Sequence, residues 1–128
     1  MNRILIVDDE ADVREHIEEE LARRGWETAT ADDGVEAVLR VIDGGWNSVL
    51  MDIRMPVLNG VDALRIIRRL NPSLPVIMFT GQAGQGEMLE TKRLGAFACI
   101  LKPVVIEKLL ALLTEATQNS KTSERFEI

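Results

Sequence analysis

The chain has 128 residues, 46% of them apolar and 28% charged, which is typical of one globular domain with a proper hydrophobic core. Its net charge of −6 argues against a nucleic-acid-binding surface, because contacts with phosphates need clustered Lys and Arg. No apolar run approaches the ~20 residues of a membrane span, and no signal-peptide pattern opens the chain, so we expect a cytoplasmic protein without a membrane span. Cys99 is the only cysteine, so we expect neither a disulfide nor a zinc cluster within the chain.

Short apolar runs predict the strands of a sheet. They lie at residues 4–7, 26–31, 49–51, 75–80 and 97–101. Continuous aliphatic and β-branched runs of this length are typical of parallel strands that are buried on both faces. The run at 26–31 is weaker and more polar, so we expect it near an edge of the sheet.

Helices are predicted between and after these strands. Apolar residues at helical spacing indicate helices over 13–21, 35–42, 61–70, about 87–94, and 105–116. Asn59 is a candidate cap for the third helix. The fourth helix follows Gly81, Gly84 and Gly86, and we expect it to be the least stable one.

Some charged residues are interpreted as ordinary surface. Arg65, Arg68 and Arg69 lie on the third predicted helix, where we expect a solvated face. His16 is the only histidine and lies between charged neighbours on the first helix. We expect it to face solvent rather than to act as a phosphodonor.

The strict alternation of strand and helix determines the predicted fold class. Short connections and the absence of internal repeats favour an α/β domain with a doubly wound, five-stranded parallel sheet and helices on both faces. In such a sheet, ligands bind outside the carboxyl ends of the strands. Residues that directly follow a strand are therefore the first candidates for chemistry.

Polar side chains follow four of the five predicted strands. The first strand is followed by Asp8, Asp9 and Glu10. The third strand ends in Asp52, the fourth ends in Thr80 and the fifth is followed by Lys102. Asp52 alone is equally compatible with a simple turn, but four matching strand ends are hard to attribute to turn chemistry. Several carboxylates this close repel one another unless a cation lies among them, and hard oxygen ligands favour Mg²⁺.

These residue types are those that phosphoryl transfer requires. An aspartate such as Asp52 can attack phosphorus and form an aspartyl phosphate. A metal ion and the ammonium of Lys102 neutralise charge on the transferred group, and the hydroxyl of Thr80 offers a hydrogen bond to it. Gly81, beside Thr80, leaves room for the phosphate to enter.

The motifs resemble those of the receiver domains of bacterial two-component response regulators. They read Ile-Leu-Ile-Val-Asp-Asp-Glu, Met-Asp-Ile-Arg-Met-Pro-x-x-Asn-Gly, Phe-Thr-Gly and Gly-Ala followed seven residues later by Lys-Pro. The resemblance covers about residues 1–117 and leaves 118–128 as a polar tail or the start of a linker. It implies a flavodoxin-like fold with strand order 2-1-3-4-5.

The resemblance also implies roles for single residues. Asp52 is the expected phosphoacceptor, and the expected Mg²⁺ ligands are Asp8, Asp9, Asp52 and the main-chain carbonyl of Arg54. Thr80 is the expected switch hydroxyl and Lys102 the expected phosphate-binding ammonium. The bond from Lys102 to Pro103 is expected to be cis, as is common in this family.

The implied function is a phosphorylation-dependent signalling switch. Its implied phosphodonor is a sensor histidine kinase or a phosphotransfer protein, and the phosphorylated domain changes its loop and fourth-helix surface to control an output. The output partner or domain is left open, as is a homodimer formed on phosphorylation. Such a domain catalyses only its own phosphorylation and dephosphorylation and is not otherwise an enzyme.

Two rival functions are weighed against this one. A phosphatase of the haloacid dehalogenase type also forms an aspartyl phosphate, but it needs a second Asp two residues after the nucleophile, where this chain has Arg54. A receiver-like domain that no longer accepts phosphate and serves only for protein contact is the other rival. The full set of polar residues at the strand ends argues against it.

One position departs from the family pattern. Many receivers carry Tyr or Phe three residues before the lysine, whereas this chain has Cys99 there. Phe97 is two residues before Cys99, and alternate residues of a strand point to the same face of the sheet. Phe97 is therefore a candidate to replace the missing ring in part. Without an aromatic ring at residue 99, we expect the population shift on phosphorylation to be smaller than in relatives that have one.

Overall fold

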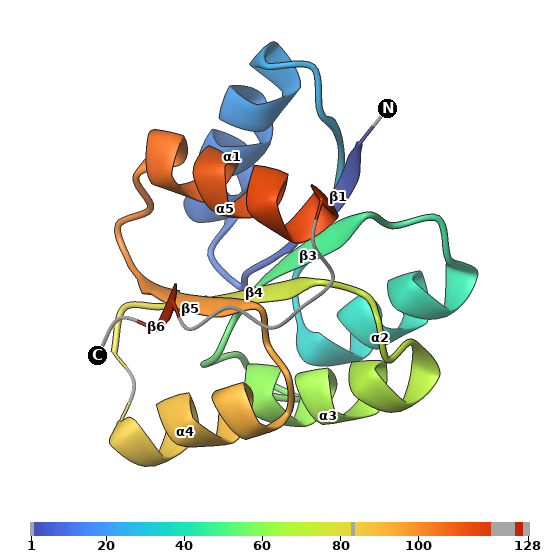
Figure 1. The fold of residues 1–128 in the computed structure, drawn as a ribbon, viewed down its shortest axis with the longest axis vertical. Coiled ribbons are helices and arrows are strands. Elements are labelled where there is room, and N and C mark those ends of the chain that lie inside the picture. Colours follow the sequence, from blue (N-terminus) through green and yellow to red (C-terminus); the bar gives the residue numbers. More distant parts are fainter. Residues whose placement is uncertain (1, 83, 119–124, 127–128) are drawn as a thin grey trace.

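A parallel sheet lies at the centre of the molecule (Figure 1). The structure is a computed structural model that describes residues 2–82, 84–118 and 125–126. The strands are β1 (Arg3–Val7), β2 (Glu27–Ala31), β3 (Ser48–Asp52), β4 (Val76–Thr80), β5 (Ala98–Leu101) and β6 (Arg125–Phe126). Their order in the sheet is β2-β1-β3-β4-β5-β6, and every neighbouring pair is parallel.

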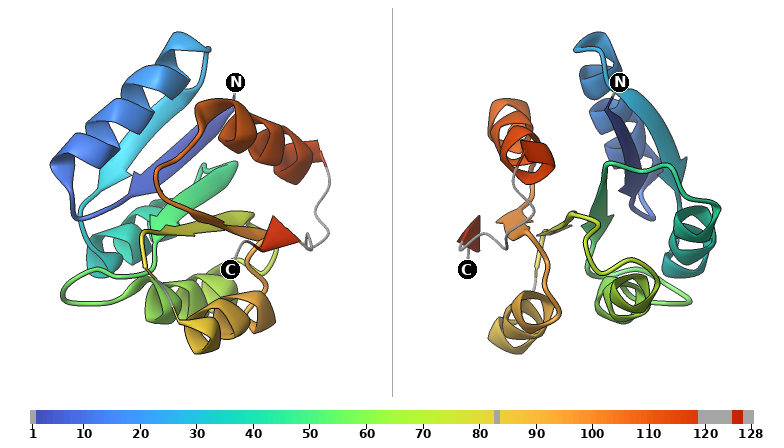
Figure 2. Two further views of the ribbon diagram at one scale, coloured as in Figure 1. Left: turned by 90° about the vertical axis from the view of Figure 1, so that its left-hand side faces the viewer. Right: turned by 45° about the vertical axis from the view of Figure 1, so that its right-hand side comes forward.

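Helices cover both faces of this sheet. They are α1 (Ala11–Arg23), α2 (Gly34–Asp43), α3 (Gly60–Leu70), α4 (Gln85–Arg93) and α5 (Ile106–Gln118). Figures 1 and 2 show α1 and α5 on one face and α2, α3 and α4 on the other. None of the helices among the described residues has the length and apolar character needed to cross a membrane.

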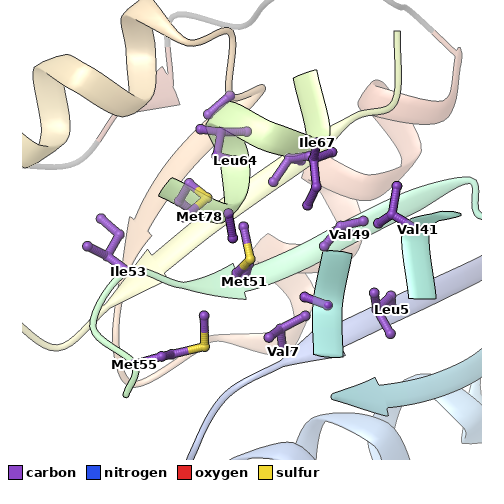
Figure 3. Packing of buried hydrophobic residues seen from close by; sticks show 14 of the residues in the cluster. Leu5, Val7, Val41, Val49, Met51, Ile53, Met55, Leu64, Ile67 and Met78 are labelled. Carbon is purple, nitrogen blue, oxygen red and sulfur yellow. The ribbon is translucent and has the colours of Figure 1, made fainter. Parts of the chain in front are cut away.

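The strands are buried on both faces because their side chains alternate between two hydrophobic clusters. In β1, Leu5 belongs to the cluster under α2, α3 and α4, whereas Ile4 and Ile6 belong to the cluster under α1 and α5. Figure 3 shows the first of these clusters, in which Val49 and Met51 of β3 pack between the sheet and the helices. The near-continuous apolar runs in the sequence reflect this burial.

The predicted fold class is confirmed. Strands one to five have the order 2-1-3-4-5, and β2 lies at an edge of the sheet, as its polar sequence indicated. The two-residue strand β6 adds a sixth member beside β5, which the five-stranded prediction did not include. Two residues in a polar segment give no periodic signal, and apart from β6 and the last residue of α5 the predicted tail lies outside the described residues.

Local sequence signals explain how the helices begin. The Asn59 side chain accepts a hydrogen bond from the N–H of Asp62 at 2.9 Å and caps α3, as predicted. Asp33 caps α2 in the same way, through the N–H of Glu36 at 2.8 Å. The sequence therefore specifies the start of each helix that follows β2 and β3 with a side-chain acceptor.

The predicted solvated arginine face on α3 is wrong for Arg68. Its guanidinium is partly buried and donates to the carbonyls of Leu74 at 2.7 Å, Asn71 at 3.1 Å and Gly95 at 3.2 Å. These carbonyls come from the end of α3 and from the loops that precede β4 and β5. Arg68 thus ties the amino ends of two strands to a helix end, a role that helical spacing alone does not indicate.

Candidate functional site

The carboxyl ends of four strands bring the predicted polar residues to one edge of the sheet. Asp8 follows β1, Asp52 ends β3, Thr80 ends β4 and Lys102 follows β5. Asp8 is fully buried, Asp52 is 4% exposed and Thr80 is 1% exposed. Polar side chains are rarely buried to this extent without a specific partner, so their burial marks this edge as a site.

The Lys102 ammonium lies between two of the carboxylates. Its Nζ is 2.8 Å from Asp8 Oδ2 and 3.0 Å from Asp52 Oδ2, and Glu10 Oε1 lies 3.5 Å away. Burial alone would lower the pKa of Lys102, but the contacts with Asp8 and Asp52 outweigh it and raise the pKa above the usual lysine value. Lys102 is therefore a permanent cation in contact with Asp52.

Asp52 has a raised pKa because burial penalises its charged form. The hydrogen bond and charge of Lys102 oppose this shift, while the nearby charge of Asp8 adds to it. Asp52 Oδ1 also accepts a hydrogen bond from the main-chain N–H of Arg54 at 3.2 Å. One carboxylate oxygen is thus held by a cation and the other by the main chain.

An acidic cluster lies beside this pair. One carboxylate oxygen from each of Asp8, Asp9 and Glu10 falls within 4.8 Å of the others, and Asp9 and Glu10 are exposed. The N–H of Glu10 donates to Asp8 Oδ1 at 2.8 Å, which orients the buried carboxylate. Among the described residues this cluster has the hard oxygen donors that Mg²⁺ prefers, and Asp52, a predicted ligand, lies outside it next to Lys102.

The loop after Asp52 has a strained and crowded conformation. Val57 has φ of 68°, and the N–H of Leu58 donates to the carbonyl of Pro56 at 2.8 Å, which makes a γ-turn. The N–H of Gly60 then donates to the carbonyl of Ile53 at 2.7 Å. A Cβ on Gly60 would lie 2.1 Å from the carbonyl oxygen of Asp52, so only glycine fits against the end of β3.

Thr80 connects the site to the loop before α4. Its Oγ1 accepts a hydrogen bond from the N–H of Gln82 at 3.1 Å, so its proton is available for donation elsewhere. The Thr80 carbonyl accepts from the N–H of Lys102 at 2.8 Å, which aligns β4 with the segment that carries the lysine. The Lys102–Pro103 peptide bond is cis, as predicted.

The structure places Phe97 away from Cys99. Cys99 is fully buried in the cluster under α2, α3 and α4, with its Sγ 3.1 Å from Met88 Sδ, whereas Phe97 packs in the cluster under α1 and α5. The proposal that Phe97 replaces the missing ring is therefore wrong, because Phe97 precedes β5 and turns to the other face. Burial raises the pKa of the Cys99 thiol to about 12, so it behaves as a small apolar group.

Some contacts of the site were not predicted from the sequence. The Arg54 side chain donates to the carbonyl of Gln82 and pairs with Glu87 at 2.7 Å, on the first turn of α4. No sequence signal indicates this contact, because the two partners are 33 positions apart. The sequence shows Glu10 only as a third acidic residue after β1 and does not indicate its contact with Lys102.

A pocket of about 470 Å³ opens beside the site, between α1 and the segment that follows β5. Its lining is mostly apolar and also holds charged groups; the residues are Glu10, Asp12, Val13, His16, Ile17, Lys102, Pro103 and Val104. His16 is exposed on α1, as expected.

Known proteins share the sequence pattern of most of this chain. The family model described as response regulator receiver domain matches residues 4–114. Regulatory protein AtoC of Escherichia coli K12 is 39% identical over 118 residues, which are 92% of this chain and 26% of AtoC. The chain spans between a quarter and half of the length of the first curated relatives that it matches.

Solved structures of similar proteins share the whole fold. A CheY-like response regulator receiver domain protein from Methanospirillum hungatei JF-1 superposes with a TM-score of 0.91 at 30% identity, covering 94% of this chain and 96% of that one. Response regulator protein TrrA from Thermotoga maritima, solved in complex with Mg(2+)-BeF, gives a TM-score of 0.83 at 30% identity and covers 91% of this chain and 99% of its own.

Proposed function

Because the chain belongs to the response regulator receiver domain family, we propose that it is a signalling switch in which Asp52 accepts a phosphoryl group from a sensor histidine kinase or a phosphotransfer protein. One observation carries this proposal. The Lys102 ammonium lies 3.0 Å from a buried carboxylate at the carboxyl end of the central strand β3. A cation in this place can stabilise negative charge on a phosphoryl group bound to that carboxylate.

Each residue of the site has a defined task in the proposed reaction. An oxygen of ionised Asp52 attacks the phosphorus of the donor, and the bond to the donor's leaving group breaks with its electron pair. Lys102 neutralises charge on the phosphoryl oxygens, and the Thr80 hydroxyl donates a hydrogen bond to one of them. The N–H of Arg54 holds the other carboxylate oxygen and orients Asp52.

The acidic cluster fits a divalent cation, because its members offer converging carboxylate oxygens and one of them is fully buried. We assign Asp8 and Asp9 of this cluster as ligands, together with Asp52 and the main-chain carbonyl of Arg54, which the resemblance to receiver domains implies. Mg²⁺ bound there would supply positive charge to the phosphoryl oxygens. The solved complex of the similar protein TrrA with Mg(2+)-BeF supports the binding of Mg²⁺.

Replacing Asp9 with Ala should weaken Mg²⁺ binding by at least about tenfold, since even an outer-shell contact of a metal site is worth that much. Phosphorylation by acetyl phosphate should slow in the same variant. The free energy of unfolding without metal should rise slightly, because Asp9 repels Asp8 and Glu10. Calorimetric titration with Mg²⁺ measures the first effect, and an affinity equal to that of the parent would remove Asp9 from the ligand set.

The proposed partners follow from the position of the site. The phosphodonor protein would approach over the pocket beside Lys102, which is lined by both apolar and charged residues. Residues 1–117 would form the receiver, and 118–128 would lead toward an output domain or end in a tail.

The phosphatase alternative remains disfavoured, because the residue two positions after Asp52 is an arginine paired with Glu87 and cannot act as a general acid.

The switch should pass from Asp52 through Thr80 to the loop before α4. Binding of beryllofluoride, a phosphoryl mimic, together with Mg²⁺ should change amide hydrogen exchange mainly between Gly81 and Cys99. The Thr80→Ala variant should lose this change, whereas Thr80→Ser should keep it because serine retains the hydroxyl. Exchange that changes only in α1 and α2 would contradict this route.

A further inference from the structure

We propose that Arg54 is a latch that holds the loop before α4 in its unphosphorylated arrangement. The latch consists of Arg54, the carbonyl of Gln82 and the carboxylate of Glu87. It goes beyond the proposed function, which assigns only the main chain of Arg54, but it rests on that function because it restrains the proposed switch. Its basis is a set of contacts that joins two loops and the first turn of a helix.

The contacts of the Arg54 side chain converge on the loop that follows Thr80. Its Nε donates to the carbonyl of Gln82, and its Nη2 lies 2.7 Å from Glu87 Oε1. The same Glu87 oxygen accepts the N–H of Gly84 at 3.2 Å, at the start of α4. A single guanidinium therefore fixes the loop at residue 82 and at the helix start.

The latch is attached directly to the proposed phosphorylation site. The main-chain N–H of Arg54 donates to Asp52 Oδ1, and the N–H of Gln82 donates to Thr80 Oγ1. A shift of the Thr80 hydroxyl toward a group on Asp52 would either lengthen this hydrogen bond or move Gln82, whose carbonyl Arg54 holds. The contact of Arg54 with the Gln82 carbonyl therefore opposes any part of this movement that displaces Gln82.

Few buried side chains anchor α4. Only Met88 and Thr91 of α4 are buried, whereas α3 buries Gly60, Ala63, Leu64 and Ile67. Arg54 and Glu87 also line an open cleft of about 350 Å³ that reaches Asp9. A weakly attached helix responds to the loss of one charged contact more than a well-buried one does.

The latch predicts that its removal favours the active arrangement. The Arg54→Ala/Glu87→Gln double variant removes one positive and one negative charge, so it leaves the net charge beside the site unchanged. The amide oxygen of Gln can still accept the N–H of Gly84 and start α4. With Mg²⁺ held constant, the beryllofluoride concentration for half-saturation should fall about three- to tenfold, because the competent state is more populated.

A second ion pair offers a matched control. Arg65 of α3 pairs with Glu90 of α4 at 3.8 Å, and no hydrogen bond links this pair to the carbonyl of Gln82. The Arg65→Ala/Glu90→Gln variant loses the same charges and should bind beryllofluoride within about twofold of the parent. In the absence of beryllofluoride, amide exchange around Gly84 should be faster in the latch variant than in this control.

Nuclear magnetic resonance titration with beryllofluoride, followed at the amides of Gly81 and Gly84, measures these affinities. A lowered half-saturation in the latch variant alone supports the latch. If the parent responds but the latch variant has an unchanged or raised half-saturation, the latch is wrong and the proposed function stands. A parent that does not respond at all overturns the proposed function, and the latch with it.

Discussion

Replacing Lys102 with Gln should destabilise the metal-free protein by about 3 kcal/mol at pH 7, because it leaves buried carboxylates without their cation. Asp8 is fully buried and Asp52 is 4% exposed, so solvent cannot replace the ammonium that lies 2.8 and 3.0 Å from them. Urea unfolding of both proteins measures the difference. Arg93→Gln, which removes an exposed cation paired with Glu90 at 3.4 Å, should change stability by less than about 0.5 kcal/mol.

The pH dependence of this loss has a defined sign. The pKa of Asp52 is already raised by burial, and loss of the Lys102 charge raises it further. A carboxyl with a raised folded-state pKa stabilises the fold below its unfolded pKa and loses that contribution as the pH rises through the folded pKa. The deficit of Lys102→Gln should therefore shrink as the pH falls from 7 to about 5.

The parent should not show this pH dependence from Lys102 itself. Its pKa is raised, so its contribution is complete below the unfolded value of 10.5 and disappears only above it. Saturating Mg²⁺ should restore part of the stability of Lys102→Gln, because binding to the native state alone stabilises it. A deficit that is independent of both pH and Mg²⁺ would show that Lys102 acts through packing instead of charge.

Replacing Gly60 with Ala should destabilise the protein by about 3 kcal/mol, the upper range for forced overpacking. The added Cβ would lie 2.1 Å from the carbonyl oxygen of Asp52 and 2.9 Å from Ile53 Cα, and both are main-chain atoms that cannot rotate away. The clash must displace the end of β3 or the start of α3, so phosphorylation should slow as well.

Gly86→Ala is the matched control for this change, since it adds the same methyl group near the start of another helix. Apart from the neighbouring residues and the backbone of α4 itself, no atom lies within 4 Å of the Cβ that alanine would place there. The higher helix propensity of alanine should stabilise this variant by up to about 1 kcal/mol. Equal unfolding midpoints in urea for Gly60→Ala and Gly86→Ala would contradict the close approach of Gly60 to Asp52.

The sequence predicted the fold well because local signals and global topology agree in most of the chain. Continuous apolar runs indicated strands buried on both faces, and Asn59 marked the start of α3. Strand β6 was missed, because its pairing with β5 depends on a distant edge and not on any local pattern. Arg68 was misplaced for a similar reason, since its acceptors lie beyond the end of α3, and one of them, Gly95, is brought to it only by the fold.

The sequence predicted those residues of the site that lie at the carboxyl ends of strands. Asp8, Asp52, Thr80 and Lys102 each stand directly after or at the end of a strand, and parallel topology brings such residues to one edge. Long-range side-chain contacts could not be predicted, and the pair of Arg54 with Glu87 is the main example. Strand parity also failed for Phe97, because the alternation holds only within a strand and β5 begins at Ala98.

The account depends most on Asp52 as the phosphoacceptor, and intact-mass measurement after incubation with acetyl phosphate and Mg²⁺ tests this directly. The parent should gain one phosphoryl group, and Asp52→Asn should gain none, because an amide is not a nucleophile here. Asp33→Asn makes the same substitution at a helix cap, where Asn serves as well as Asp, and should be phosphorylated like the parent. Full phosphorylation of Asp52→Asn would contradict the proposed site.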